Sequence, residues 1–491
     1  IRAADQAHQL ITHLRRCLPE RSGVAALLHE YALSSTEGVA LMCLAEALLR
    51  IPDAATADRL INDKLGQADW AKHVPNSEQF FVNATNWALA FTEQWIHLEN
   101  REETLAGVGK NLISHLGAPV IREALRAAMR GLGEQFILGR DMPEALQHAA
   151  DARARGWRHS FDMLGEAALG QADANRYASA YRSGIDSLGQ QARQNPASPL
   201  AHSPGISIKL SALHPRYEMA QRERVMKELL PTLIGLACAA RTQGVPITFD
   251  AEESDRLEIS LDLFEALAFE QSLAGWDGLG LAVQAYQKRA PAVIDWLSEL
   301  ARCSAHRFNI RLVKGAYWDS EIKLAQERGL SDYPVYTNKA ATDISWLACA
   351  AKLLDDPRAF YPQFATHNAL CVARVIEMAR QRKTSASEFE FQRLHGMGRE
   401  LYEPLIGQYP CRVYAPVGSH TDLLAYLVRR LLENGANSSF VHLLEDERIP
   451  PEELLADPLS RWIESRSRTP LPAPAALFAP QRKNSAGKDM N

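Results

Sequence analysis

The sequence lacks the short motifs that mark the common cofactor and metal sites. It contains no GxGxxG fingerprint of a Rossmann unit, no GxxxxGK[ST] phosphate loop and no HExxH zinc motif. The stretch Gly107-Val-Gly-Lys110 lacks both the first glycine of a phosphate loop and the Ser or Thr that follows its lysine. A dinucleotide cofactor would therefore have to bind on another kind of fold.

Paired cysteines and long apolar runs are lacking as well. The seven cysteines are scattered and form no CxxC pair, so neither a disulfide framework nor a zinc site is indicated, and a reduced cytoplasmic compartment is expected. No apolar run reaches the length of a membrane span, and no signal peptide opens the chain. The first residue is Ile1 rather than Met, as expected of a fragment or a processed chain.

No region concentrates charge of one sign. The formal net charge is -5 and both signs are interleaved, so no nucleic-acid-binding tail or stripe is indicated. Hydrophobic residues make up 46% of the 491 positions. The chain can therefore bury a large core, and it is longer than one ordinary domain.

Residues 1–140 are predicted to form a helical arm and an all-α domain. Ser34 and Glu37 have the spacing of a capping box. Residues 38–50 are rich in good helix formers and apolar enough for a buried helix.

Between residues 141 and 445, short β-like runs alternate with helical stretches. The runs lie at residues 159–164, 206–210, 245–249, 280–284, 308–313, 361–366, 389–394 and 412–414. Eight such alternations favour an α/β fold, a closed (β/α)8 TIM-type barrel preceded by the all-α domain. The last helix is predicted at 420–435. Residues 446–491 are polar and proline-rich, as in a linker or a mobile tail.

Polar residues near the carboxyl ends of these strands are the first candidates for a functional site, because sites of TIM barrels lie at that rim. Any one of them is equally compatible with a satisfied structural group, but the whole set at one rim favours function. The set is Lys209, Asp250, Glu252, Glu253, Gln284, Arg311, Lys314, His367, Asn368 and Tyr414.

The segment from Arg429 to Glu433 is a second candidate. On a helix, Glu433 faces both Arg429 and Arg430. Such pairs usually lie on a solvated surface, but the flanking residues 423–428 are apolar apart from one tyrosine hydroxyl. This context favours a partly buried site for a carboxylate or a phosphate.

A third candidate is the predicted strand end from Arg311 to Trp318. Gly315 would allow a ligand to approach the backbone closely. Tyr317 and Trp318 are suited to line a flat cofactor, although aromatic residues beside a strand more often belong to the core.

Five segments resemble the proline dehydrogenase domain of the proline utilization A (PutA) family of bifunctional flavoenzymes. These segments are residues 205–217, 249–258, 311–318, 364–368 and 426–436. The resemblance implies FAD-dependent oxidation of L-proline to pyrroline-5-carboxylate, with the electrons passed to a membrane quinone, in proline catabolism to glutamate. FAD supplies the electron sink that no side chain can.

The resemblance also implies the roles of individual residues. FAD contacts are expected from Gln284, Arg311, Val313, Lys314, Gly315, Ala316, Trp318, Thr337, Lys339, Thr342, His367, Asn368 and Glu433. Substrate contacts are expected from Lys209, Arg429 and Arg430 on the proline carboxylate and from Leu312, Tyr317 and Tyr414 against the ring. The expected catalytic group is Arg311, Tyr414, Lys209 and Asp250. Glu166 matches a glutamate that pairs with Arg429 over the substrate, although an acid there also suits the start of a helix.

Two features of the family are missing from the sequence. It contains no aldehyde dehydrogenase module, towards which residues 484–487 look like the lead-in, and no ribbon-helix-helix segment. The expected partners are therefore L-proline and a membrane quinone, with no nucleic acid bound by this fragment and no metal. A cytoplasmic location is expected, and the electron acceptor implies peripheral association of the full-length enzyme with the inner face of the cell membrane.

Two other classes of function stay open on the residues alone. A metal-dependent barrel hydrolase would use Asp250, Glu252 and His367, although the chain offers no close HxH pair. A non-enzymatic helical scaffold with a degenerate barrel is the other alternative. Flavin colour, bound zinc or the absence of both in the purified protein would separate the three.

Overall fold

The computed structural model describes residues 2–17, 136–193, 199–418, 440–445, 448–465 and 471–487, and a few positions between 51 and 59. The predicted capping box, most of the predicted all-α domain and the helix predicted at 420–435 lie outside the described residues. Arg429, Arg430 and Glu433 lie outside them as well.

Eight parallel strands close into a barrel in the order of the sequence. Each predicted β run overlaps one strand, and the TIM-type barrel is confirmed. The strands are β1 (Trp157–Met163), β2 (Gly205–Ile208), β3 (Ile247–Phe249), β4 (Leu279–Gln284), β5 (Phe308–Val313), β6 (Phe360–Ala365), β7 (Glu390–Leu394) and β8 (Cys411–Val417).

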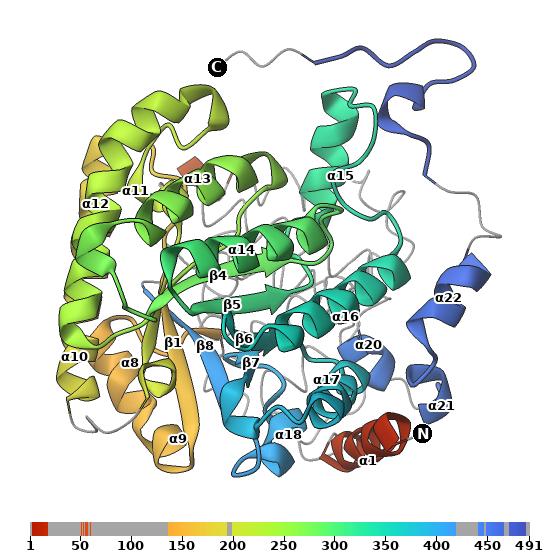
Figure 1. The fold of residues 1–491 in the computed structure, drawn as a ribbon. Coiled ribbons are helices and arrows are strands. Elements are labelled where there is room, and N and C mark those ends of the chain that lie inside the picture. Colours follow the sequence, from red (N-terminus) through yellow and green to blue (C-terminus); the bar gives the residue numbers. More distant parts are fainter. Residues whose placement is uncertain are drawn as a thin grey trace.

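Helices surround the strands (Figure 1). Those before and within the barrel are α1 (Arg2–Cys17), α8 (Met142–His148), α9 (Ala150–Ala154), α10 (Gln171–Ala192), α11 (Leu210–Leu213), α12 (Arg222–Gln243), α13 (Leu257–Ala268), α14 (Ala290–Ser304), α15 (Trp318–Glu327), α16 (Lys339–Asp355), α17 (Ala369–Arg382) and α18 (Arg399–Tyr402). The carboxyl-terminal ones are α20 (Phe440–Glu445), α21 (Pro451–Leu454) and α22 (Pro458–Ser465). Among the described residues, no helix combines the length and the apolarity needed to cross a bilayer.

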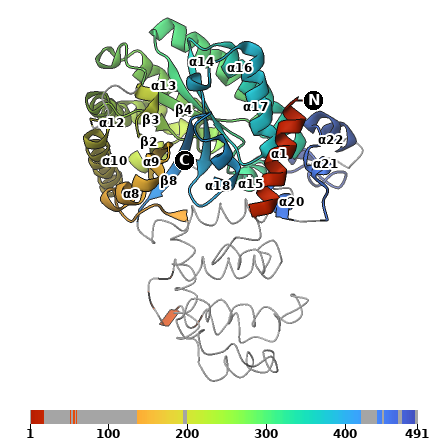
Figure 2. The same ribbon diagram turned by 90° about the horizontal axis from the view of Figure 1, so that it is seen from below.

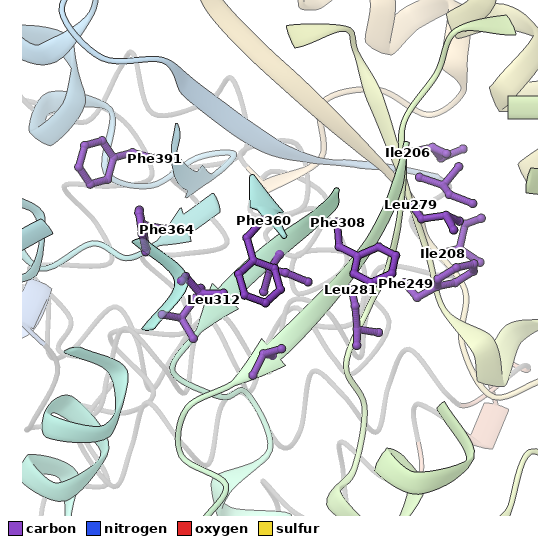
Figure 3. Close-up of a cluster of buried hydrophobic side chains, with 14 of the residues drawn as sticks. Ile206, Ile208, Phe249, Leu279, Leu281, Phe308, Leu312, Phe360, Phe364 and Phe391 are labelled. Carbon is purple, nitrogen blue, oxygen red and sulfur yellow. The ribbon is translucent and has the colours of Figure 1, made fainter. Parts of the chain in front are cut away.

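The two faces of each strand differ in polarity. Apolar side chains such as Ile208, Phe249 and Phe364 are buried in the main core, and Figure 3 shows them along successive strands. The residues that alternate with them are largely polar and project into the barrel lumen. A hydrogen bond from Arg311 on β5 to Ser160 on β1 demonstrates this, because β5 and β1 lie on opposite sides of the barrel. Side chains in the lumen of TIM barrels are mostly bulky and branched, so a polar lumen is unusual.

Asparagine caps fix the starts of the two helices next to the rim. The Asn338 side chain accepts a hydrogen bond from the Ala340 amide at 2.8 Å at the start of α16. The Asn368 side chain accepts from Leu370 and Cys371 at 2.9 and 3.1 Å at the start of α17. These bonds satisfy backbone donors that a helix leaves unpaired at its first turn.

Both ends of the described chain pack against the barrel helices. Helix α1 lies along α17, far from it in sequence (Figure 2). Residues 471–487, predicted as part of a linker or mobile tail, pack against the carboxyl end of α15. There the Asn484 side-chain amide donates to the Gln326 carbonyl at 2.6 Å, and the Gly487 amide donates to the Arg328 carbonyl at 2.9 Å. These contacts join residues far apart in the sequence, and the proline-rich composition does not reveal them.

Candidate active site

Four of the predicted rim residues meet in one place. We call these four residues and Asp162 the rim cluster. Lys209 follows β2, Asp250 follows β3, Arg311 lies in β5 and Tyr414 lies in β8. Asp250 accepts hydrogen bonds from Arg311 NH1 at 2.6 Å, from the Tyr414 hydroxyl at 2.6 Å and from Lys209 Nζ at 3.3 Å. Asp250 therefore binds both cations and the tyrosine of this group.

Asp162 completes the cluster, and the sequence analysis missed it. Its Oδ1 accepts a hydrogen bond from Lys209 Nζ at 2.6 Å, and its side chain is fully buried in β1. Its Oδ2 is buried without a hydrogen-bond partner. The available signal was an ionisable residue inside a predicted buried strand, which the search for residues at strand ends passed over.

The charges of the rim cluster shift one another's proton affinity. Burial raises the pKa of Asp162 above its usual value, against the attraction of Lys209. Burial also acts to lower the pKa of Lys209, but Asp162, Tyr414 and Asp250 raise it well above the usual value. Burial and the two carboxylates raise the pKa of Tyr414. Lys209 is therefore cationic and Tyr414 is a neutral hydroxyl at neutral pH.

Aromatic contact reinforces the position of Arg311. Its guanidinium lies 4.9 Å from the centre of the Tyr414 ring, a cation–π distance. Its NH2 donates to the Ser160 and Ser207 hydroxyls at 3.1 and 2.9 Å. These contacts hold the guanidinium between the two serine hydroxyls and the Tyr414 ring.

A second group of charges follows β5 and begins α16. Lys314 and Lys339 both bind Asp343, at 2.5 and 2.9 Å. The two ammonium groups outweigh the opposite effect of burial and hold the pKa of Asp343 at about 2. Asp343 was not predicted. One carboxylate for two cations leaves an excess of positive charge beside the rim, and Thr342 is its neighbour on the same helix.

The segment after β5 is shaped by one close contact. Gly315 has φ +141°, and a Cβ there would lie 2.4 Å from the ring of Tyr286. The backbone angle and the Tyr286 ring both require glycine here, and the predicted close approach of a ligand stays a prediction. Gln284 turns its side-chain oxygen towards the Ala316 amide, at 3.4 Å. Trp318 is 38% exposed and donates from its indole nitrogen to the Tyr336 carbonyl.

His367 and Asn368 follow β6, as predicted. The His367 ring nitrogen Nε2 accepts a hydrogen bond from the Leu394 amide at 3.2 Å. The side-chain oxygen of Asn368 caps α17, so its amide nitrogen is the group left to face a ligand. Both residues therefore have a structural contact beside any contact with a cofactor.

The remaining predicted residues lie at different depths. Val313, Glu166 and Tyr317 are half-buried beside the rim, and Thr337 is exposed before α16. Leu312 does not join the rim cluster: its side chain is fully buried in the apolar core. Successive residues of a strand point to opposite faces, so the neighbour of Arg311 faces away from the lumen.

The residues of the hydrolase alternative do not form one site. Asp250 is engaged by the cations of the rim cluster. Glu252 accepts from the Ser211 amide at 3.0 Å and pairs with Arg256 at 2.9 Å, and His367 is bonded to Leu394. Within the described part of the chain, no group of three His, Cys, Asp or Glu residues is placed to hold a metal ion.

Comparisons with known proteins show the family of the chain. A family model described as proline dehydrogenase matches residues 145–443. The chain is 51% identical to the bifunctional protein PutA of Klebsiella aerogenes and to that of Escherichia coli (strain K12), in each case over 99% of this chain and 38% of the relative. A crystal structure of a mutant Bradyrhizobium japonicum proline utilization A is similar with a TM-score of 0.74 and 51% identity, over 99% of this chain and 48% of that one. The chain thus spans well under half the length of the curated relatives named here.

A second family model corrects one prediction. Residues 23–136 match a model described as the DNA-binding domain of proline dehydrogenase, which contradicts the expectation of no nucleic-acid partner. That expectation rested on charge and on the missing ribbon-helix-helix segment, and acidic residues outnumber basic ones in this stretch. A charge pattern therefore could not reveal the match. Most of these residues lie outside the described ones.

Proposed function

The chain belongs to the proline dehydrogenase family, and we propose that it oxidises L-proline to pyrroline-5-carboxylate with FAD as its cofactor. We further propose that the electrons pass to a membrane quinone, from a cytoplasmic protein associated peripherally with the inner face of the cell membrane. The observation that carries the proposal is the rim cluster, in which Lys209 and Arg311 are held at the barrel mouth by Asp162, Asp250 and Tyr414.

The cluster suits a small zwitterionic substrate. Lys209 keeps its charge, as its raised pKa requires, and lies 8% exposed at the rim. Together with Arg429 and Arg430 it would bind the proline carboxylate and fix the orientation of the ring. Tyr414 covers Arg311 with its aromatic face and presents an apolar surface to the substrate ring.

The residues at the ends of β4, β5 and β6 fit FAD. Lys314 and Lys339 share the single carboxylate of Asp343, which leaves positive charge for a diphosphate. The exposed indole of Trp318 offers a flat apolar surface at the same rim. The side-chain amide nitrogen of Asn368, whose oxygen caps α17, adds a hydrogen-bond donor.

Catalysis would divide between the cofactor and the rim. When bound, FAD would supply the hydride acceptor that no side chain provides. Arg311 keeps a positive charge in a dry site, where it stabilises negative charge that develops in the transition state. Asp250 holds Lys209, Arg311 and Tyr414 in one arrangement, so that binding and charge stabilisation occur in the same place.

The direct test is the colour and the activity of the purified protein. We expect a flavin spectrum, release of the flavin into the supernatant on acid precipitation, and reduction of a dye when L-proline is added. A colourless protein that cannot be reconstituted with FAD would refute the cofactor. A yellow protein that does not reduce the dye with L-proline would refute the substrate. A separate assay with a soluble quinone and with lipid vesicles tests the acceptor and the membrane contact.

A further inference from the structure

A buried series of hydrogen-bonded side chains runs through the barrel lumen, from the beginning of β7 to Arg311. Arg311 donates from Nε to the side-chain oxygen of Gln392 at 2.8 Å. Gln392 donates from its amide nitrogen to Glu390 Oε1 at 2.9 Å. Both residues lie in β7 and are at most 2% exposed, and they alternate with the apolar side chain of Phe391.

The orientation of the Gln392 amide is dictated by Glu390. An ionised carboxylate only accepts hydrogen bonds, so the NH2 group of Gln392 must face it. The carbonyl oxygen of the same amide is then turned to Arg311, which only donates. A swap of the two ends would place a donor against a donor and an acceptor against an acceptor.

Glu390 is ionised because two arginines surround it. Arg412 binds it through Nε at 2.5 Å and NH2 at 3.1 Å, and Arg158 binds it at 3.2 Å. Burial acts to raise the pKa of Glu390, but the arginines and the other donors lower it below the usual value. We call Arg158, Glu390 and Arg412 the floor cluster.

Gln392 differs in charge from the other strong acceptor of Arg311. Asp250 binds NH1 as a carboxylate and compensates the charge of the guanidinium. Gln392 binds Nε as a neutral amide, so it fixes the direction of the group without adding a second negative charge beside it. A carboxylate at this position would place two negative charges against one guanidinium.

We propose that Gln392 is a positioning residue, which transmits the fixed geometry of the floor cluster to Arg311 and sets the place of its guanidinium at the rim. The inference rests on the proposed function only in giving Arg311 a role in the reaction. The position of the side chain can be measured without it.

The test is Gln392→Met, which keeps the length of the side chain and removes the acceptor. We expect a crystal structure of the variant to show the Arg311 guanidinium displaced, and the midpoint potential of bound flavin to change. We expect kcat to fall about tenfold or more while KM changes less than about threefold, since Arg311 acts on developing charge. The matched control is Gln363→Met on β6, a lumen glutamine for which no hydrogen bond to Arg311 is present.

A double variant separates positioning from general damage to the barrel. If Gln392 acts through Arg311, then Arg311→Met with Gln392→Met should be no slower than Arg311→Met alone. Independent, multiplicative losses would overturn the inference, as would an unmoved Arg311 with unchanged kcat in Gln392→Met. Should Gln392→Met fail to fold, Gln392→Asn decides in the same way, because its shorter amide cannot reach both Glu390 and Arg311.

The proposed function fails separately from this inference. A wild-type protein that neither binds flavin nor oxidises proline would refute the function. The crystallographic position of Arg311 in Gln392→Met would still decide whether Gln392 sets it.

Discussion

The rim cluster and the floor cluster contain similar residues in one lumen, but they differ in how completely they are satisfied. In the floor cluster, both oxygens of Glu390 bind arginines, and Arg412 also donates to the carbonyls of His159, Ser203 and Ala201. In the rim cluster, Asp162 Oδ2 is buried without a hydrogen bond. A saturated ion cluster holds strands together, whereas a buried polar atom without a partner is more typical of a catalytic site.

The largest effect should come from removing the carboxylate of the floor cluster. Glu390→Ala leaves Arg158 and Arg412 buried without their carboxylate, so we expect a loss of about 3–5 kcal/mol in the free energy of unfolding. Urea denaturation followed by circular dichroism measures it. Glu299→Ala, on an exposed helix pair with Arg302, is the control and should change stability little. A loss under about 1 kcal/mol for Glu390→Ala would show that the floor does not hold the barrel.

At the rim, removal of a cation should impair substrate recognition. We expect Lys209→Met to lower kcat/KM for L-proline. The corresponding loss of transition-state stabilisation should be about 2–5 kcal/mol, the range for losing one member of a buried charge pair. Steady-state kinetics measures the change. The matched control is Lys352→Met, an exposed lysine on α16 paired with Asp295, which should leave kcat/KM unchanged. Equal kinetics in Lys209→Met and wild type would remove Lys209 from the substrate site.

Removing one tyrosine hydroxyl that contacts each cluster tests whether the two clusters have separate roles. Tyr414→Phe removes one hydrogen bond to the carboxylate of Asp250, so we expect kcat/KM to fall. The corresponding loss of transition-state stabilisation should be about 1.5–3 kcal/mol. Tyr361→Phe removes a hydrogen bond from Arg158 at the floor, at 2.9 Å, and should leave the kinetics unchanged. If both variants lose activity equally, the two clusters do not have separate roles.

The smallest expected effect is a difference in pH dependence. The pKa of Asp162 is raised above 3.8 in the folded protein, so the folded state binds the extra proton and this residue's contribution to stability grows as pH falls through the raised pKa towards 3.8. The pKa of Glu390 is lowered from 4.5, so its contribution is present above pH 4.5 and is lost below it. The two contributions therefore have opposite slopes, each on the order of 1 kcal/mol per pH unit at most.

Denaturation of wild type, Asp162→Asn and Glu390→Gln over that pH range measures both slopes. Relative to Asp162→Asn, wild type should become more stable in acid. Relative to Glu390→Gln, it should become less stable below pH 4.5. Two slopes of the same sign would contradict the assignment of the carboxylates.

The sequence predicted the strands closely and the charged network only in part. The β runs were visible because apolar residues such as Phe308 and Ile310 recur at every second position. Lys209, Asp250, Arg311 and Tyr414 were found because they are polar and lie at or near the carboxyl ends of the predicted strands.

What the sequence could not reveal depends on contacts between distant strands. Asp162 becomes a partner of Lys209, and Gln392 a partner of Arg311, only after the barrel closes. The contact that requires glycine at position 315 comes from Tyr286, which is 29 positions away in the chain, and no local pattern links the two. The contact of residues 471–487 with α15 has the same character, since the Asn484 side chain donates to a carbonyl of that helix.

Anaerobic addition of L-proline to the flavin-loaded protein tests the central claim most directly, namely that the rim and not the floor handles the substrate. Loss of the flavin's visible absorbance should be fast in wild type and in Tyr361→Phe, and at least about tenfold slower in Lys209→Met at the same proline concentration. Absence of bleaching in flavin-loaded wild type, or equal rates in wild type and Lys209→Met, would contradict the account.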